Sequence, residues 1–260
     1  MTTPRVFIIR HGETEWSLNG RHTGLSDIPL TSNGERRIRA TGRALVGQDR
    51  LIVPRNLAHV YVSPRARAKR TVELLNLGLR EPLPWTDKHP EDHAEVGTRS
   101  DARVEVTEGV REWDYGDYEG VTSKEIREGR KQRGEGEWDI WRDGCPGGES
   151  PTDITSRCDA VIADIRKRFH AHAIGRPKGS VAEPFDVLVV AHGHFLRAFA
   201  ARWIGKNIAD NPSLILEAGG VGTLSYEHHS LDEPAILLGG AFMSDVVEDA
   251  ERKTSMQVSQ

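Results

Sequence analysis

The sequence has little cysteine and no long apolar run. Its two cysteines, Cys145 and Cys158, are too few for a disulfide framework and too few for a cysteine-rich zinc site. No segment approaches the ~20 apolar residues that a membrane-spanning helix needs, and the apolar run behind Arg5 is too short for the core of a signal peptide. We therefore expect a protein of a reducing compartment, the cytoplasm with the nucleus left open, that has no membrane as partner.

The sequence also lacks a strong excess of either charge. Lysine and arginine total 35 against 39 aspartates and glutamates, which gives a formal net charge of −4. Since no global basic field recruits nucleic acid, we expect no nucleic-acid partner. The 260 residues, of which 37% are hydrophobic and 28% charged, suffice for one large folded domain. We assign that domain to residues 1–245, with a surface insertion at 80–103, and expect a disordered tail at 246–260.

Short apolar runs alternate with helical patterns along the chain. This alternation predicts an α/β fold with three layers, α/β/α, around a mostly parallel central sheet. Strands are expected at 6–9, 57–62, 103–106, within 184–191, and near the end at 221–229 and 234–240, and helices at 31–46, 64–77, 122–133, 154–169 and between 194 and 203.

Histidines directly follow two of the expected strands. Arg10 and His11 stand behind the first strand, and His192 stands behind a later one. Ligands of open α/β sheets bind beyond the carboxyl ends of the strands, so neighbouring strands would bring both imidazoles to one crevice. Arg67, near the start of an expected helix, can point there too. Arginines, histidines and helix N-termini together suit a phosphate dianion.

Each histidine also has an alternative interpretation. His11 alone would fit a buried strand-end histidine that is hydrogen-bonded to a backbone carbonyl. His192 and His194 form an H-x-H pair that would fit two zinc ligands, although the neighbouring arginines would repel a cation. Considered by itself, His194 fits a structural place near the start of a helix.

The order of the motifs is more informative than any one of them. "RHGETEW" is followed by "TGLSDIPLTSNG", then by "SPRARAKRT", "REWDYGDYEG" and "AHGH". In this order the motifs resemble the histidine phosphatase superfamily, whose fold is phosphoglycerate-mutase-like. The resemblance extends from Arg5 to about Gly240, which is nearly the whole chain.

The resemblance implies roles for five residues. His11 matches the nucleophile that becomes phosphorylated on a ring nitrogen, and Glu112 matches the proton donor to the leaving oxygen. Arg10, Arg67 and His192 match the groups that hold the phosphoryl oxygens. Neither a metal nor another cofactor is implied. An imidazole suits this chemistry because it is substantially neutral near pH 7, so that it can attack phosphorus without a separate base.

A closer resemblance within the superfamily is to the fungal sedoheptulose-1,7-bisphosphatases. It is carried by "REWDYGDYEG", "IWRDGCPGGE", "AHGHFLR" and "LSYEHHSLDEPA". It implies a small anionic phosphorylated substrate, most of all sedoheptulose 1,7-bisphosphate, and a second anion clamp made by Arg197 and His228. His228 is preferred to His229 on this resemblance alone. The substrate-binding residues that it implies are His22, Thr23, Trp113, Asp114, Tyr115, Arg197 and His228.

Two other activities fit the same motifs. One is a phosphoglycerate mutase-type phosphotransferase, which returns the phosphoryl group to another oxygen, and the other is a phosphatase of other small phosphomonoesters. A binding domain that has lost its chemistry would keep the fold, but the intact set of site residues argues against it. Assembly into a homo-oligomer is left open.

Overall fold

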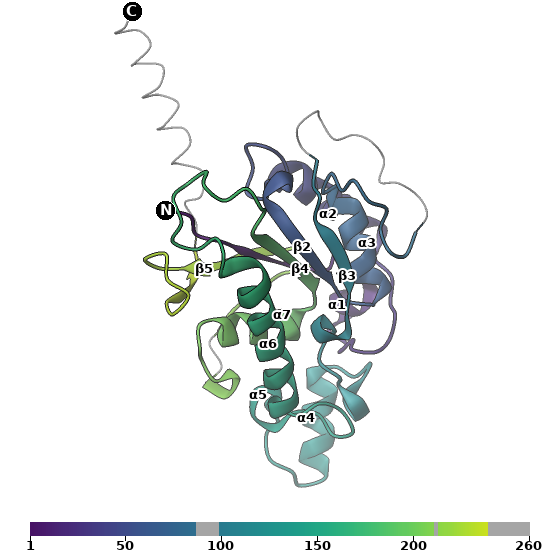
Figure 1. Cartoon of the computed structure of the whole chain (residues 1–260). Helices are drawn as coiled ribbons and strands as arrows, with labels where there is room; N and C mark the ends of the chain where they lie inside the picture. Colours follow the sequence, from purple (N-terminus) through teal and green to yellow (C-terminus); the bar gives the residue numbers. More distant parts are fainter. Residues whose placement is uncertain (87–98, 211–212, 239–260) are drawn as a thin grey trace, which may run out of the picture.

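A six-stranded mixed sheet forms the centre of the molecule (Figure 1). The computed structural model describes residues 1–86, 99–210 and 213–238. In space the strands follow the order β3-β2-β4-β1-β5-β6, and each expected strand is present. Their bounds are β1 Val6–Arg10, β2 Leu57–Val62, β3 Arg103–Val106, β4 Asp186–Ala191, β5 Val221–Tyr226 and β6 Pro234–Leu237.

Helices connect the strands and extend the molecule at one end. Short 3₁₀ turns precede β2, follow β3 and lie within the loops near 116 and 208. The α-helices are α1 Glu15–Asn19, α2 Ser32–Leu45, α3 Ala66–Leu75, α4 Ser123–Gln132, α5 Ile140–Asp143, α6 Pro151–Ile165 and α7 Gly193–Trp203.

Four strands of the sheet run parallel. β1 and β2 both pair in parallel with β4, and β3 pairs in parallel with β2, whereas β5 and β6 are antiparallel to their neighbours. Arg10 lies opposite Ala191, so that β1 and β4 end at the same edge of the sheet. The two strands are therefore parallel neighbours, which is the condition under which the histidines behind them meet. β5 runs in the opposite direction, and its first residue, rather than its last, lies at that edge.

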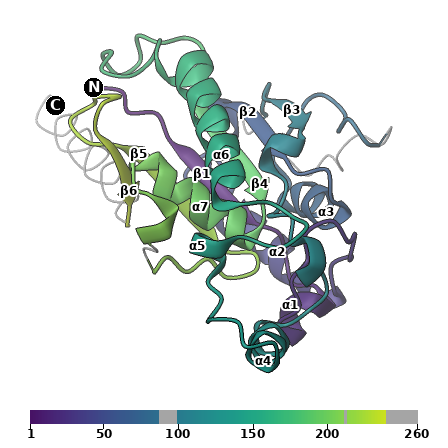
Figure 2. The same cartoon turned by 90° about the horizontal axis from the view of Figure 1, so that it is seen from below.

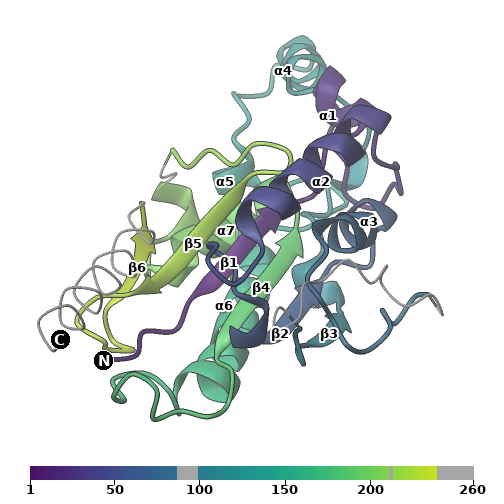
Figure 3. The same ribbon diagram turned by 90° about the horizontal axis from the view of Figure 1, so that it is seen from above.

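Alternating apolar side chains give the sheet two buried faces. Val6 and Phe7 are both fully buried, yet they belong to separate hydrophobic clusters because successive strand residues point to opposite faces. α2 and α3 cover the face of Phe7, and α6 and α7 cover the face of Val6 (Figures 2 and 3). This arrangement confirms the expected three layers with a mostly parallel central sheet.

The helix starts follow from local capping. The Thr31 side chain accepts a hydrogen bond from the Gly34 N–H and so begins α2, as the sequence predicted. α3 begins at Ala66 and not directly after Pro64. The Ala66 N–H donates to the Asp27 carboxylate at 2.7 Å, so the cap of this helix comes from a distant loop.

Three further expectations concern the end of α6, the insertion and tail, and a membrane-spanning helix. The regular part of α6 ends at Ile165, before the expected Phe169, and a wider π-helical turn follows at Arg166–His170. Residues 87–98 of the expected insertion and the whole expected tail, 246–260, lie outside the described residues. In the part of the chain that the structure describes, no helix has the length and apolar character needed to cross a bilayer.

Candidate active site

The carboxyl ends of β1 and β4 bring two histidines together. His11 and His192 follow the paired residues Arg10 and Ala191, and their ring centroids lie 5.0 Å apart at an angle of 62°. Both residues are buried. The two strand-end histidines therefore lie side by side, as the parallel pairing of β1 with β4 requires.

His11 is held as one tautomer. Its Nδ1 lies 2.7 Å from the Gly12 carbonyl oxygen, which can only accept a hydrogen bond, so Nδ1 carries the proton. Burial, and then the nearby Arg67 and Arg10 guanidiniums, lower the pKa of His11 well below its ordinary value. At neutral pH the ring is therefore uncharged and Nε2 keeps a free lone pair. His11 thus combines the two interpretations of its sequence position. Its Nδ1 is hydrogen-bonded to a backbone carbonyl, as in a structural histidine, and its Nε2 is free, as a nucleophile requires.

Gly12 allows β1 to end close against α2. A Cβ on this residue would lie 2.8 Å from Cγ1 of Ile38, which is closer than packed carbon atoms approach. The Gly12 N–H donates to Oγ1 of Thr71 in α3 at 3.1 Å. The backbone that aims His11 is thus held from both helices on this face of the sheet.

Arg67 supports the site from behind the lining of the cavity. The side chain is fully buried, and its Nε donates to Nδ1 of His192 at 3.2 Å. Its Nη1 donates to the Ser26 carbonyl at 2.7 Å and its Nη2 to the Thr23 carbonyl at 2.9 Å. One guanidinium therefore ties the loop after α1 to the end of β4.

His192 is neutral and has a defined tautomer as well. Burial, followed by the charge of Arg67, lowers the pKa of His192 well below its ordinary value. Since Nδ1 accepts from Arg67, the single proton is on Nε2, which donates to Oγ of Ser63 at 2.7 Å.

Glu112 is positioned by backbone donors at the start of α7. Its Oε1 accepts from the Trp113 and Phe195 N–H groups at 2.9 and 2.8 Å, and its Oε2 accepts from the His194 N–H at 3.1 Å. Because the first N–H groups of a helix have no partner within the helix, a carboxylate is a natural cap for them. Arg157 braces the same loop by donating to the Glu112 carbonyl at 3.4 Å.

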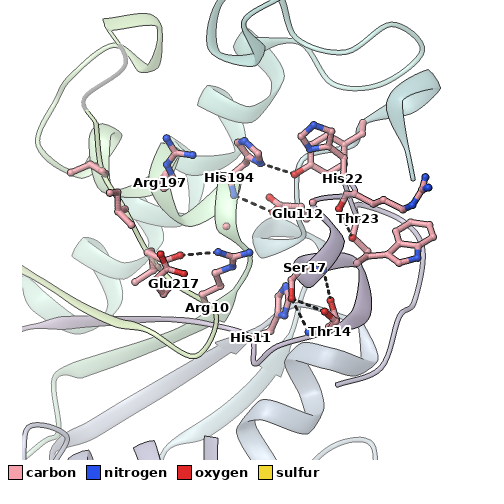
Figure 4. Close-up of a pocket in the computed structure, with 18 residues that line it drawn as sticks. Arg10, His11, Thr14, Ser17, His22, Thr23, Glu112, His194, Arg197 and Glu217 are labelled. Atoms are coloured by element: carbon pink, nitrogen blue, oxygen red, sulfur yellow. Dashed lines mark hydrogen bonds between the residues drawn. The ribbon is translucent and has the colours of Figure 1, made fainter. Parts of the chain in front are cut away.

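His11, Glu112 and Arg10 line a cavity of about 320 Å³ (Figure 4), whereas the fully buried Arg67 and His192 lie behind its wall. Its charged lining consists of Arg10, Arg21 and Arg197 with Glu112 and Glu217. In Figure 4, His11 lies at one end of the cavity and Arg197 and His22 lie toward the other. The complete lining is Arg10, His11, Thr14, Trp16, Ser17, Gly20, Arg21, His22, Thr23, Glu112, Tyr115, Gly193, His194, Arg197, Leu214, Ile215, Leu216 and Glu217.

Arg10 is packed tightly into the wall of the cavity. Its Nη1 donates to the Leu216 carbonyl at 2.9 Å, and its Nε is buried without a hydrogen-bond partner among the described residues. A Cβ on Gly193 would lie 3.3 Å from both Cζ and Nε of Arg10. The glycine at the start of α7 therefore leaves the space that this guanidinium occupies.

Four of the seven expected substrate-binding residues line the cavity, whereas the expected residues Trp113 and Asp114 do not. His22, Thr23, Tyr115 and Arg197 all line it. Trp113 is instead fully buried in the hydrophobic core, where its Nε1 donates to the Glu149 carbonyl at 3.0 Å. Asp114 uses its carboxylate to accept from the Gly116 N–H at 3.0 Å. In this structure the run 112–115 thus presents only its first and last residues to the cavity.

The expectation for His228 needs correction. His228 follows β5, whose last residues lie at the sheet edge opposite to the one where His11 stands. Its side chain is 79% exposed and its Nδ1 lies 2.6 Å from Oε2 of Glu233 in the turn before β6. The antiparallel direction of β5 therefore carries this residue away from the cavity, and it does not form an anion clamp with Arg197.

The structure also places residues at the cavity that the sequence did not single out. Arg21 and Glu217 contribute charges, and Trp16 and Ile215 contribute apolar surface. Arg21 directly precedes the expected His22, which is the one signal in the sequence that could have indicated it. The segment around Glu217 has no motif, and only the folded chain brings it across the end of β1, where the Gly219 N–H donates to the Arg10 carbonyl at 3.1 Å.

The H-x-H pair does not converge on a metal position. Nδ1 of His192 accepts from Arg67, whereas Nδ1 of His194 lies 2.7 Å from the hydroxyl of Tyr115. Over residues 1–86, 99–210 and 213–238, no cluster of three or more histidine, cysteine, aspartate or glutamate side chains is arranged to hold a metal ion.

Known proteins resemble the chain over nearly its whole length. The family model of the histidine phosphatase superfamily (branch 1) matches residues 6–89 and 91–233. The chain is 38% identical to the sedoheptulose 1,7-bisphosphatase of Saccharomyces cerevisiae, over 96% of this chain and 97% of that protein. It is 32% identical to an acid phosphatase of Mycobacterium tuberculosis, over 86% and 87%. The solved structure of an open-reading-frame product from Mycobacterium tuberculosis superimposes with a TM-score of 0.65 at 29% identity, covering 91% of this chain and 97% of that one.

Proposed function

The chain belongs to branch 1 of the histidine phosphatase superfamily and is a phosphoric monoester hydrolase, and on this premise we propose that it hydrolyses a sugar bisphosphate through a phosphohistidine at His11. Sedoheptulose 1,7-bisphosphate is the proposed substrate, because this is the substrate in the name of the yeast relative and that relative matches the chain end to end. The observation that carries the proposed mechanism is the uncharged His11 ring, whose Nδ1 is bonded to the Gly12 carbonyl and whose Nε2 is free beside two guanidiniums.

In the first step, Nε2 of His11 attacks phosphorus and the bond between phosphorus and the ester oxygen breaks. The leaving oxygen takes a proton from the Glu112 carboxyl group, so the sugar departs as a neutral alcohol. Arg10 and Arg67 carry fixed positive charge next to the transferring group, where negative charge develops on the phosphoryl oxygens. Backbone donors hold Glu112 in the same place before and after the transfer.

In the second step, a water molecule attacks the phosphorus of phosphohistidine. The Glu112 carboxylate left by the first step accepts one proton of that water. The bond between phosphorus and Nε2 breaks, inorganic phosphate leaves, and His11 returns to its neutral form with Nδ1 still donating to the Gly12 carbonyl. Atoms and charges therefore balance over the two steps without any further reactant.

The far end of the cavity supports a substrate with a second phosphate. Arg197 lines the cavity, its guanidinium lies 4.9 Å from the centroid of the Trp141 ring, and its Nε is buried without a partner among the described residues. Arg21 lines the same cavity. A volume of about 320 Å³ falls in the range of small-molecule sites and can hold a phosphorylated sugar. In place of the expected clamp of Arg197 with His228, we therefore propose Arg197 with Arg21.

A phosphate-release screen in the presence of EDTA tests this function. The panel contains sugar mono- and bisphosphates, nucleotides and a phosphopeptide, and His11→Ala serves as the inactive reference. We expect preferred hydrolysis of sedoheptulose 1,7-bisphosphate, abolished in the variant. A preference for nucleotides or phosphopeptides would contradict the substrate class, and release that survives in His11→Ala would contradict the mechanism. Conversion of 3-phosphoglycerate to 2-phosphoglycerate in the presence of 2,3-bisphosphoglycerate would identify a mutase instead.

A further inference from the structure

Buried Tyr115 and half-buried His194 form a pair at the cavity that the proposed phosphoryl transfer does not use. The Tyr115 hydroxyl lies 2.7 Å from Nδ1 of His194, and both residues line the cavity. Tyr115 is only 2% exposed. The His194 ring is enclosed by aromatic neighbours, with centroids at 5.7 Å from Tyr115, 5.4 Å from Trp141 and 5.8 Å from His22.

The pair defines which nitrogen of His194 carries the proton. Burial raises the pKa of the Tyr115 hydroxyl well above its ordinary value, so the phenol keeps its proton. Burial also lowers the pKa of His194 well below its ordinary value, so the ring is neutral and has one N–H. Nδ1 is the only acceptor that the described part of the chain offers to the Tyr115 hydroxyl. The hydroxyl therefore donates to Nδ1, and the single imidazole proton is on Nε2.

The Nε2–H group of His194 is left for a ligand. It makes no hydrogen bond to any residue that the structure describes, although the residue lines the cavity. The main-chain N–H of the same residue donates to Oε2 of Glu112 at 3.1 Å. His194 and Glu112 line the same cavity and lie beside one another in Figure 4, so an oxygen that accepts from Nε2–H can lie near the oxygen that Glu112 protonates.

We propose that His194 is a specificity residue that donates from Nε2–H to a hydroxyl of the substrate next to the leaving oxygen, and that Tyr115 is the positioning residue that keeps the proton on that nitrogen. This inference rests on the proposed function, because the position of the leaving oxygen is taken from it. The ligand that it selects is a phosphate ester with a hydroxyl on the adjoining carbons, as polyols and sugars have. An ester of a plain alkyl alcohol offers this N–H no partner and so forgoes one hydrogen bond.

Two phosphate esters that differ only in hydroxyl groups test the inference. Glycerol 1-phosphate and propyl phosphate are compared by kcat/KM in the wild-type protein, where we expect glycerol 1-phosphate to be preferred roughly tenfold, the effect of about one hydrogen bond. In His194→Phe the ratio of the two kcat/KM values should fall to about one, and in Tyr115→Phe it should fall part of the way. His194→Gln should restore much of the preference, because its amide N–H reaches a similar position.

The chain provides a matched control for this pair. Tyr226 and His170 form a second buried tyrosine–histidine contact, also at 2.7 Å, away from the cavity. Tyr226→Phe should therefore leave the ratio unchanged, although it too removes a buried phenol. If His194→Phe keeps the wild-type ratio, or if Tyr226→Phe lowers it as much as Tyr115→Phe does, the inference is wrong.

Nitrogen-15 NMR of the imidazoles reads the tautomer without any turnover. We expect the His194 proton on Nε2 in the wild type, with its signal shifted by glycerol 1-phosphate and not by propyl phosphate. A wild-type spectrum with the proton on Nδ1, or equal shifts with both esters, would overturn the inference whatever the activity. Absence of phosphate release from every ester would instead contradict the proposed function, and the NMR result would still decide the role of His194.

Discussion

The Arg67 guanidinium donates to the His192 imidazole at 3.2 Å and so joins the start of α3 to the end of β4. The same guanidinium holds the carbonyl groups of Thr23 and Ser26, whose loop forms one wall of the cavity. Arg67 thus has two roles. Its positive charge acts on His11, and its hydrogen bonds hold the loop that forms one wall of the cavity. Its removal should affect both activity and stability, which gives the first prediction.

Arg67→Met keeps the aliphatic stem and removes the guanidinium. We expect kcat/KM to fall by about 10²–10³-fold, because one fixed charge at the transferring group is lost. The free energy of unfolding should fall by about 2–4 kcal/mol, because buried carbonyl groups lose their donors. Steady-state kinetics and chemical denaturation measure the two effects. Arg39→Met, on the exposed surface of α2, is the matched control and should change neither. A variant that loses activity at full stability would show that Arg67 does not support the loop.

Gly193→Ala tests the packing of Arg10. The added methyl group would approach Cζ and Nε of Arg10 to 3.3 Å and push the guanidinium from its place. Because small displacements of catalytic groups are costly, we expect kcat/KM to fall roughly tenfold, while the melting temperature stays near the wild-type value since α7 tolerates alanine well. Gly136→Ala, where the new methyl group meets no atom, provides the control. Full activity in Gly193→Ala would show that catalysis does not depend on the space that Gly193 leaves for the Arg10 guanidinium.

Acid stability should depend on histidines that are buried in neutral form. Burial lowers the pKa of His170 to about 3, whereas an unfolded histidine titrates near 6.5. Its contribution to stability is therefore complete above about pH 6.5 and is lost as the pH falls, because only the unfolded chain then binds the proton. His170→Asn, which keeps an acceptor for Tyr226, should make the free energy of unfolding fall less steeply below about pH 6, by up to ~1.4 kcal/mol per pH unit.

Denaturation at a series of pH values measures this slope. His229→Asn, which replaces a histidine at the exposed surface, is measured in parallel as the control. Identical slopes in the wild type and in His170→Asn would show that His170 does not remain neutral in the folded protein. Since His170 lies away from the cavity, activity at neutral pH is expected to be retained.

The sequence predicted the sheet and the core of the site because both follow from local rules. Apolar runs defined the strands. Once β1 and β4 are parallel neighbours, Arg10 at the end of β1 and His11 and His192 directly after the two strands meet at one edge. No such local rule gives the position of a loop residue such as Arg21, because that position depends on how the loop folds back over the sheet.

The errors have the same physical origin. His228 was assigned to the substrate without a direction for β5, and an antiparallel strand reverses which of its ends reaches the site. Trp113 and Asp114 were grouped with Glu112 and Tyr115 as one contiguous run, but the chain turns there, and one side chain enters the core while the other binds a backbone N–H. Strand direction and local side-chain direction are properties of the tertiary structure, and the sequence alone did not define them at these places.

The proposed mechanism requires a phosphoryl group on Nε2 of His11 between the two chemical steps. Mixing the protein with its preferred phosphate ester, stopping the reaction within milliseconds under alkaline conditions and mapping the modified peptide by mass spectrometry tests it most directly. We expect a phosphorylated peptide containing His11, with NMR placing the phosphorus on Nε2, and no such peptide from His11→Ala. Rapid phosphate release with an unmodified His11 at every time point, or with the phosphoryl group on another side chain, would contradict it.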